Sequence, residues 1–243
     1  MLYIVGTPIG NLDDISERCA CTLREVDLIA AEDTRHSLRL LQRLEISKPM
    51  VSYHEHNEAS RTADLIERLR QGTNIALITD AGMPSISDPG RRLIAACIEN
   101  ELSYTVIPGP SAVLVALTGS GFQNDQWTFG GFLPNKSGQR ERILTDACVT
   151  GNTAIFFESP HRITKTLAVL AQIAPQRRIC VARELTKQFE EFRIGFPPVL
   201  LAHYEAHPPK GEITLLIDGY TREEIKDQKR AERDERHSYS QPN

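Results

Sequence analysis

The sequence predicts an α/β protein made of two domains whose sheets are mainly parallel. Short apolar runs suited to strands alternate with longer stretches of helical period, a pattern typical of parallel sheets covered by helices. A length of 243 residues suits two domains of ordinary size. A segment rich in glycine and polar residues, 119–125, separates two such series. We therefore expect an N-terminal α/β domain at 1–118, a C-terminal α/β domain at 119–220 and a polar tail at 221–243.

Five strands are expected in the N-terminal domain, because five short apolar runs are bounded by polar or turn-forming residues. They cover residues 3–5, 28–30, 51–53, 75–79 and 104–107. Two helices between them carry start signals, Ser60 for one and Asp88 followed by Pro89 for the other. Another helix is expected at 111–118. The residues expected to face the core are Ala63, Ile66 and Leu69 in the first helix and Leu93, Ile94, Cys97 and Ile98 in the second.

The C-terminal domain is expected to repeat this alternation of strands and helices. Its strands are expected at 127–133, 154–157, 179–182 and 213–217, with helical stretches around Ile143 and Leu167. From Thr221 onward the chain has no apolar face, and acids alternate with bases. This pattern predicts a frayed helix or a disordered tail.

Charge and cysteine content narrow the class of protein. A formal net charge of −4 argues against a generic nucleic-acid binder, although it leaves room for a local basic patch. Five cysteines without a CxxC pair, together with a start unlike a secretory signal, predict a cytoplasmic protein. The apolar runs are too short to cross a bilayer, so no membrane is expected. His54 and His56 could begin a metal site, but no other cluster supplies further ligands, and we expect no metal.

Charged and turn-forming residues follow nearly every expected strand. In open parallel sheets, ligands bind beyond the carboxyl ends of the strands, where loops and helix N-termini converge. Ordinary connections also favour polar residues, but chain reversal alone does not require the charged groups that recur beside glycine and proline. The segments in question are 6–11, 32–35, 54–57, 80–84 and 108–111 in the N-terminal domain, and 158–162, 183–187 and 210–212 in the C-terminal domain.

The first of these segments, 6–11, only superficially resembles a phosphate-binding loop. It has no lysine followed by serine or threonine, and it does not spell GxGxxG. Pro8 also removes one backbone donor. The loop therefore favours a ligand without phosphates.

Together, the strand-end segments resemble those of the tetrapyrrole-methylase superfamily. The likeness covers Leu2 to about Asp218 and is specific to the ribosomal branch, the 16S rRNA (cytidine-2'-O)-methyltransferases. One such motif would be weak evidence for the family, whereas nine motifs in the family's order are strong evidence. The motifs are LYIVGTPIGNL, LIAAEDTRHS, YHEHNE, TDAGMPSISDPG, IPGPSA, GFLP, FFESPHR, ARELTK and PKGEI.

This resemblance implies a homodimer of two-domain subunits that binds S-adenosylmethionine in a cleft between the domains. The implied reaction is 2'-O-methylation of the ribose of a cytidine in the decoding centre of 16S rRNA, with the 30S subunit as partner. The donor's ammonium group could meet Asp80, and its carboxylate a helix N-terminus near Pro110 or Asp88. Carried over by motif, the donor-binding residues are Thr7, Pro8, Gly10, Asn11, Asp80, Ala81, Gly82, Pro84, Ser111, Ala112, Glu158 and Ser159.

The chain departs from the family pattern in three places. Gly6 stands where many relatives have alanine, and Met83 where threonine is usual. Many relatives also continue into a small helical domain, where this sequence has only the polar tail. The last difference leaves the mode of RNA binding open.

Methyl transfer to a ribose hydroxyl calls for a base or an electrostatic helper near the acceptor oxygen. The expected catalytic residues are Glu158, His161, Glu184, Asp33 and Arg35, with His54 as a further possible base. The expected RNA-binding residues are Arg35, His54, Arg162, Arg183, Lys187 and Lys210.

Each of these candidates also has a purely structural interpretation. Glu32 or Asp33 could only pair with Arg35, His161 could only cap the helix after Pro160, and Glu184 could only serve that helix's N-terminus.

Two other functions fit the same residues. One is methylation of a small tetrapyrrole or a protein side chain, although TPIGNL, DAGMP and ESPHR favour the RNA branch. The other is a non-catalytic module that binds S-adenosylmethionine.

Overall fold

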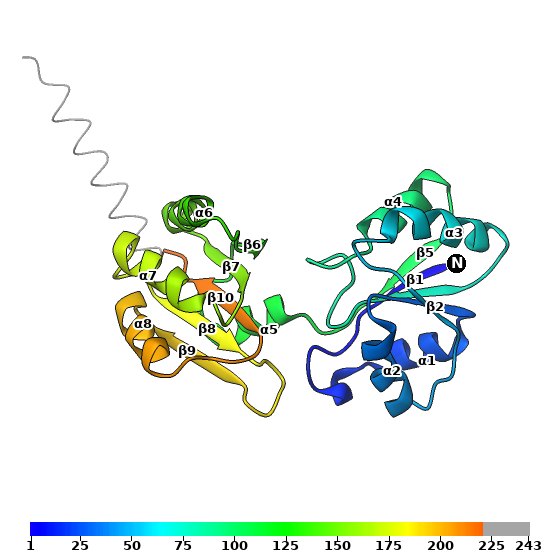
Figure 1. Ribbon diagram of the computed structural model, residues 1–243, viewed down its shortest axis with the longest axis horizontal. Coiled ribbons are helices and arrows are strands. Elements are labelled where there is room, and N and C mark those ends of the chain that lie inside the picture. The colour runs from blue at the N-terminus through cyan, green and yellow to red at the C-terminus, as the bar shows by residue number, and fades with distance from the viewer. Residues whose placement is uncertain (221–243) are drawn as a thin grey trace, which may run out of the picture. The chain divides into compact units, whose positions relative to one another are not determined.

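The computed structural model describes residues 1–220, which form two compact units (Figure 1). The first unit comprises Met1–Ala112 together with Thr186–Gln188. The second comprises Val113–Leu185 and the described residues from Phe189 onward. The polar tail expected at 221–243 lies outside the described residues. Within the described part, no helix is both long and apolar enough to cross a membrane.

The first unit contains a five-stranded parallel sheet in the order β3-β2-β4-β1-β5. All five strands expected in this region are confirmed, and every pairing between them is parallel. Strands β2 and β4 are buried along their whole length, as is usual where helices cover both faces of a parallel sheet. Their bounds are β1 Leu2–Val5, β2 Leu28–Ala31, β3 Met50–Ser52, β4 Ile75–Ile78 and β5 Tyr104–Ile107.

Helices cover the two faces of this sheet in pairs (Figure 1). The short helix η1 (Leu12–Asp14) precedes α1 (Glu17–Glu25), and α1 and α2 (Thr34–Arg43) pack in one apolar cluster. Helices α3 (Glu58–Arg70) and α4 (Arg91–Glu99) pack in the other. Each strand therefore leads into a loop at the same edge of the sheet, which we call the first edge.

Helices α3 and α4 begin at different residues from those expected. The N-cap of α3 is Asn57 rather than Ser60, and Ala63 is exposed. The N-cap of α4 is Gly90 rather than Asp88, because the chain first makes a loop with left-handed residues, among them Ser87 at φ 64°. Of the residues expected to face the core, Ile98 is 56% exposed and was wrongly placed.

The second unit has a mixed sheet in the order β6-β7-β10-β8-β9. The expected fold class is confirmed, but only β6 and β7 run parallel here, and the other three pairings are antiparallel. Strand β9 was not expected. The bounds are β6 Trp127–Phe132, β7 Thr153–Glu158, β8 Ile179–Arg183, β9 Glu191–Gly195 and β10 Ile213–Ile217.

Three helices of the second unit share one apolar core with its sheet. They are α6 (Ser137–Thr150), α7 (Ile163–Ile173) and α8 (Pro197–Ala206). The helix expected at 111–118 is α5 (Ala112–Ser120). Strands β7 and β8 both pair antiparallel with β10, so they run in the same direction and end at one edge. We call it the second edge.

Candidate functional site

The loops after β1 and β4 are joined at the first edge by a short backbone bridge. The Thr7 N–H donates to the Gly82 carbonyl at 2.9 Å, and the Gly82 N–H donates back to the Thr7 carbonyl at 3.1 Å. The Thr7 hydroxyl, itself buried, donates to the Thr79 carbonyl at 3.1 Å. Gly82 has φ +80°, a conformation that side chains with a Cβ rarely adopt. Two of the expected donor-binding residues, Thr7 and Gly82, therefore lie side by side in a rigid arrangement.

The loop after β5 packs directly against the loop after β1 through two glycines. A Cβ on Gly109 would lie 2.7 Å from the Cα of Gly6, and a Cβ on Gly6 would lie 2.6 Å from the sulfur of Met83. Such distances leave no space for a side chain. The two glycines thus bring three loops of the first edge into contact.

The loops after β2 and β4 bind each other through one carboxylate from each loop. Glu32 accepts the Asp80 N–H at 3.3 Å, and Asp80 accepts the Asp33 N–H at 3.2 Å. Burial raises the pKa of Glu32. Hydrogen bonds from the Arg35 side chain and backbone lower the pKa of Asp33 to about 2. A carboxylate with so low a pKa is a weak proton acceptor, which counts against Asp33 as the base.

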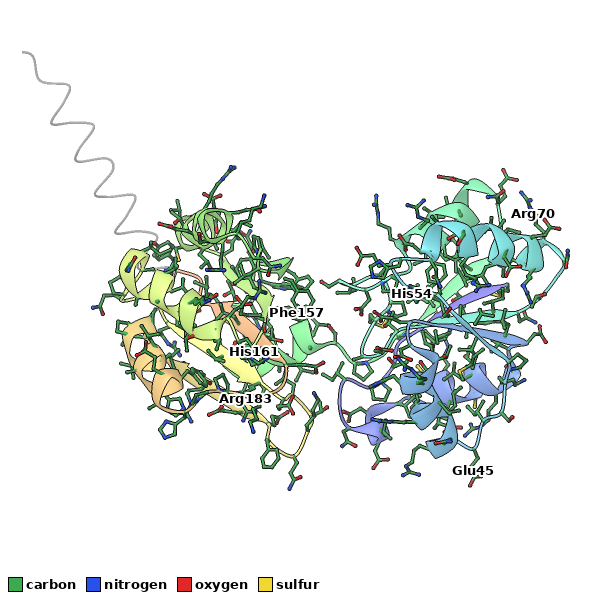
Figure 2. All side chains as sticks on the ribbon, viewed as in Figure 1. Glu45, His54, Arg70, Phe157, His161 and Arg183 are labelled. Atoms are coloured by element: carbon green, nitrogen blue, oxygen red, sulfur yellow. The ribbon has the colours of Figure 1, made fainter. Side chains whose placement is uncertain are left out.

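Two buried polar atoms of the first edge have no hydrogen-bond partner within residues 1–220. They are the hydroxyl of Thr79 and the Nδ1 atom of His54, whose Nε2 lies 3.2 Å from the Asn57 amide (Figure 2). Buried polar groups are nearly always paired in folded proteins. The first edge therefore has hydrogen-bonding capacity left for a polar ligand, and it fits a donor with ammonium, carboxylate and hydroxyl groups.

A pocket of about 520 Å³ opens in the first unit beside helices α3 and α4. Glu32 lies in its wall, so the pocket adjoins the carboxylate loop. The wall also contains residues that were not predicted as site residues. In the sequence, nothing distinguishes these residues except their position in loops and first helical turns. The charged side chains that line it are Glu32, Glu55, Glu58, Asp88, Arg91 and Arg92.

The remaining expected donor-binding residues of the first unit differ in how deeply they are buried. Pro8 and Pro84 are buried, whereas Gly10 and Asn11 are exposed, and Asn11 caps the short helix η1. Ala81 is half-buried beside Gly82. Ser111 and Ala112 lie at the start of α5, where the first unit ends.

Glu158 is the most buried charged group at the second edge, with a side chain 0% exposed. It accepts hydrogen bonds from the Ser159 N–H at 2.7 Å and the Thr166 hydroxyl at 2.6 Å, and it pairs with Arg162 at 2.6 Å. Arg162 also donates to the Leu133 carbonyl at 3.0 Å. Because its oxygens are occupied, Glu158 is suited to positioning Arg162. Thr166 was not expected, and its link to Glu158 depends on the turn between β7 and α7.

Three sequence motifs meet at the second edge. Glu158 and Arg183 both lie opposite Ile213 of β10. Arg183 donates to the Lys210 carbonyl at 3.0 Å and pairs with Glu191 at 3.3 Å, a partner that was not expected because β9 was missed.

The structural interpretations of Glu184 and His161 are both wrong. Glu184 accepts the Glu212 N–H at 3.0 Å, and no helix begins beside it. Helix α7 begins at Ile163 and has Arg162 as its N-cap. His161 is exposed, and no described residue bonds to its ring. Lys187 lies in the short segment Thr186–Gln188, which belongs to the first unit.

Within residues 1–220, no group of three or more His, Cys, Asp or Glu side chains is arranged to hold a metal ion. The five cysteines are unpaired, and four of them are buried.

Comparison with known proteins places these features in a family. The model of the Tetrapyrrole (Corrin/Porphyrin) Methylases matches residues 1–196. The ribosomal RNA small subunit methyltransferase I of Synechocystis sp. is 46% identical over 225 residues, which cover 92% of this chain and 81% of that protein. The protein of the same name from Thermotoga maritima is 43% identical over 218 residues, 90% of this chain and 98% of that protein.

Solved structures agree on the fold. Diphthine synthase aligns with a TM-score of 0.70 at 14% identity, over 90% of each chain. The methyltransferase CobJ aligns with a TM-score of 0.68 at 18% identity, over 90% of this chain and 93% of that one. The chain therefore belongs to the tetrapyrrole (corrin/porphyrin) methylase family, whose methyl donor is S-adenosylmethionine.

Proposed function

We propose that this protein transfers a methyl group from S-adenosylmethionine to the ribose 2'-hydroxyl of a cytidine in the decoding centre of 16S rRNA. The observation that carries the proposal is 46% identity, across 92% of the chain, to a relative named ribosomal RNA small subunit methyltransferase I. The proposed substrate is the 16S rRNA within the 30S subunit, and the proposed compartment is the cytoplasm.

S-adenosylmethionine supplies a methyl carbon activated by a sulfonium. We assign its binding to the first edge, where the Thr7–Gly82 bridge and the Gly6–Gly109 contact hold the loops rigidly. The Thr79 hydroxyl, which has no hydrogen-bond partner among residues 1–220, and the Asp80 carboxylate, whose Oδ1 accepts the Asp33 N–H, are the groups that would bind its polar parts. Holding the donor and the acceptor in line contributes much of the acceleration in such a displacement.

We propose that His161, rather than Glu158, is the base that accepts the proton of the 2'-hydroxyl. The oxygens of Glu158 bind Ser159, Thr166 and Arg162, whereas the His161 ring is exposed and has no partner among residues 1–220. Histidine is also the side chain that serves most often in general acid–base catalysis. Arg162, held by Glu158, is the proposed partner of the acceptor's phosphate or developing alkoxide.

The reaction is tested by offering labelled donor to purified 30S subunits, naked 16S rRNA and a tetrapyrrole. Label in the 30S sample, mapped to the 2'-oxygen of one cytidine, is the expected result. Label in the tetrapyrrole would replace the proposal with a small-molecule reaction. If no sample acquires label, the remaining interpretation is a module that binds the donor without transferring its methyl group.

The assignment of His161 is tested by the variant His161→Asn. We expect the single-turnover rate to fall by about 10²-fold or more, because a positioned base contributes on this order. Donor affinity, measured by calorimetry, should not change. A variant with the wild-type rate and pH profile would exclude His161 as the base.

A further inference from the structure

Helix α2 carries three arginines in a row on its exposed side. Arg35, Arg39 and Arg43 are four residues apart, so each is rotated by about 40° and shifted by about 6 Å along the helix from the one before. We call them the α2 arginine row. All three are exposed, and the side chains of Arg35 and Arg43 are 91% and 61% accessible.

The opposite side of α2 is buried, which fixes the direction of the row. Leu40 and Leu41 are buried, and Leu41 belongs to the apolar cluster beneath α1 and α2. The helix cannot turn the row toward the core without exposing these residues. The row therefore faces away from the sheet of its own unit.

No acid lies on α2 to neutralise the row. Arg35 and Arg43 pair with Asp33 and Asp13 beyond the helix, each at 3.1 Å, whereas Arg39 has no acidic partner among residues 1–220. Exposed pairs of this kind contribute little stability and exchange readily for other anions.

Helix α3 gives the contrasting case within the same unit. It also exposes arginines, but Arg61 and Arg68 pair with Asp64 of the same helix. Alternating charges of this kind are typical of a helix face in contact with water. In a chain of net charge −4, three arginines on a helix without acids call for a different explanation, since two of them find partners only outside the helix and Arg39 finds none among residues 1–220.

We propose that the α2 arginine row binds phosphate groups of the 16S rRNA backbone. Guanidinium groups bind phosphate oxygens in pairs of parallel hydrogen bonds and set the position of a protein on RNA without reading its sequence. The row begins two residues after Asp33, whose N–H is bound by Asp80 of the first edge, so it leads from the site outward along the helix. This inference rests on the proposed function and names the surface that holds its substrate.

The test compares Arg39→Gln/Arg43→Gln with the matched control Arg61→Gln/Arg68→Gln. Each variant loses two positive charges from one exposed helix, and glutamine preserves helix propensity. The measured quantities are the affinity for 30S subunits across a salt series, the KM for 30S and the affinity for the donor. For the α2 variant we expect the slope of log K against log salt to fall by about 1.5, since each phosphate contact contributes about 0.7–0.9.

We also expect the KM for 30S to rise at least tenfold in the α2 variant, with donor affinity and the control variant unchanged. The variant Arg39→Lys/Arg43→Lys, which keeps the charges, should keep most of the salt slope. Equal salt slopes in the wild type, the α2 variant and the control would overturn the proposal. Binding to 30S is measured without methyl transfer, so a wild type that binds but adds no label would contradict only the proposed function.

Discussion

At the scale of single residues, burial separates groups that look equivalent in the sequence. Glu158 ends β7 and His161 lies in the turn after it, but Glu158 is enclosed by three donors whereas His161 faces solvent. Asp33 and Glu32 are neighbours whose pKa values move in opposite directions, because Asp33 bonds to Arg35 and Glu32 is desolvated. The role of each of these groups therefore depends on its surroundings rather than on its residue type.

Removing Glu158 should cost far more stability than breaking an exposed ion pair. Glu158→Ala is expected to lower the free energy of unfolding by about 3 kcal/mol, because Arg162 is left partly buried without its partner. Urea denaturation measures the loss. Asp146→Ala, which breaks the exposed pair with Arg142, is the control and should cost less than about 0.5 kcal/mol. Equal losses in the two variants would show that the Glu158–Arg162 pair is not structural.

Asp33 should stabilise the fold only above acid pH. Its folded pKa of about 2 lies below the ordinary 3.8, so its contribution is full above that ordinary value and is lost as pH falls through the folded one. Because the Asp33–Arg35 pair is exposed, Asp33→Asn should lower the urea midpoint only slightly at neutral pH, with a gap that closes between about pH 4 and 2. A gap that stays constant down to about pH 2, or widens there, would contradict the assignment.

At the scale of elements, close packing of loops explains the glycines at the ends of β1 and β5. Gly6 and Gly109 touch through their backbones, so the two neighbouring strands end in one compact wall. The composition of these loops identified them in the sequence. The contact between them, however, depends on β1 and β5 being neighbours in the sheet.

A methyl group at position 109 should therefore separate the loops. Gly109→Ala is expected to destabilise the protein by about 2 kcal/mol through overpacking and to weaken donor binding measured by calorimetry. Gly138→Ala is the control, because nothing lies within 4 Å of its new Cβ on α6 and alanine favours a helix. Wild-type donor affinity in Gly109→Ala would mean that this contact does not shape the site.

At the scale of the whole molecule, we propose that two copies of the chain associate. Exposed apolar side chains gather along β9 and the start of α8, where Ile194, Phe196 and Val199 are 42%, 44% and 64% exposed. Apolar groups exposed together on and beside an edge strand are typical of an interface.

The dimer is tested by light scattering of the purified protein. The expected mass is twice the 27.2 kDa of one chain. Val199→Glu should shift the mass toward one chain, because it places a charge in the apolar group, whereas Val149→Glu on α6 should leave the dimer intact. A fully active protein of single-chain mass would contradict the proposal.

Local patterns in the sequence were enough to predict most strands, the loops at their ends and the family. Apolar runs such as 75–79 identify buried strands, because burial on both faces requires continuous hydrophobicity. The direction of β10 was not predictable in this way, since a buried strand has the same composition whichever way it runs. Strand β9 was missed because its half-buried EFRIG segment lacks such a run.

The strand-end motifs and their order along the chain identified the family and its methyl donor, because these motifs lie in the loops that are expected to contact the ligand. Only the tertiary structure decided which carboxylate is enclosed, which glycines touch and which arginine of α2 has no acidic partner among residues 1–220. These properties depend on neighbours distant in sequence, such as Thr166 for Glu158 and Asp80 for Asp33. Desolvation and hydrogen bonding act through space, so they are settled only once the chain has folded.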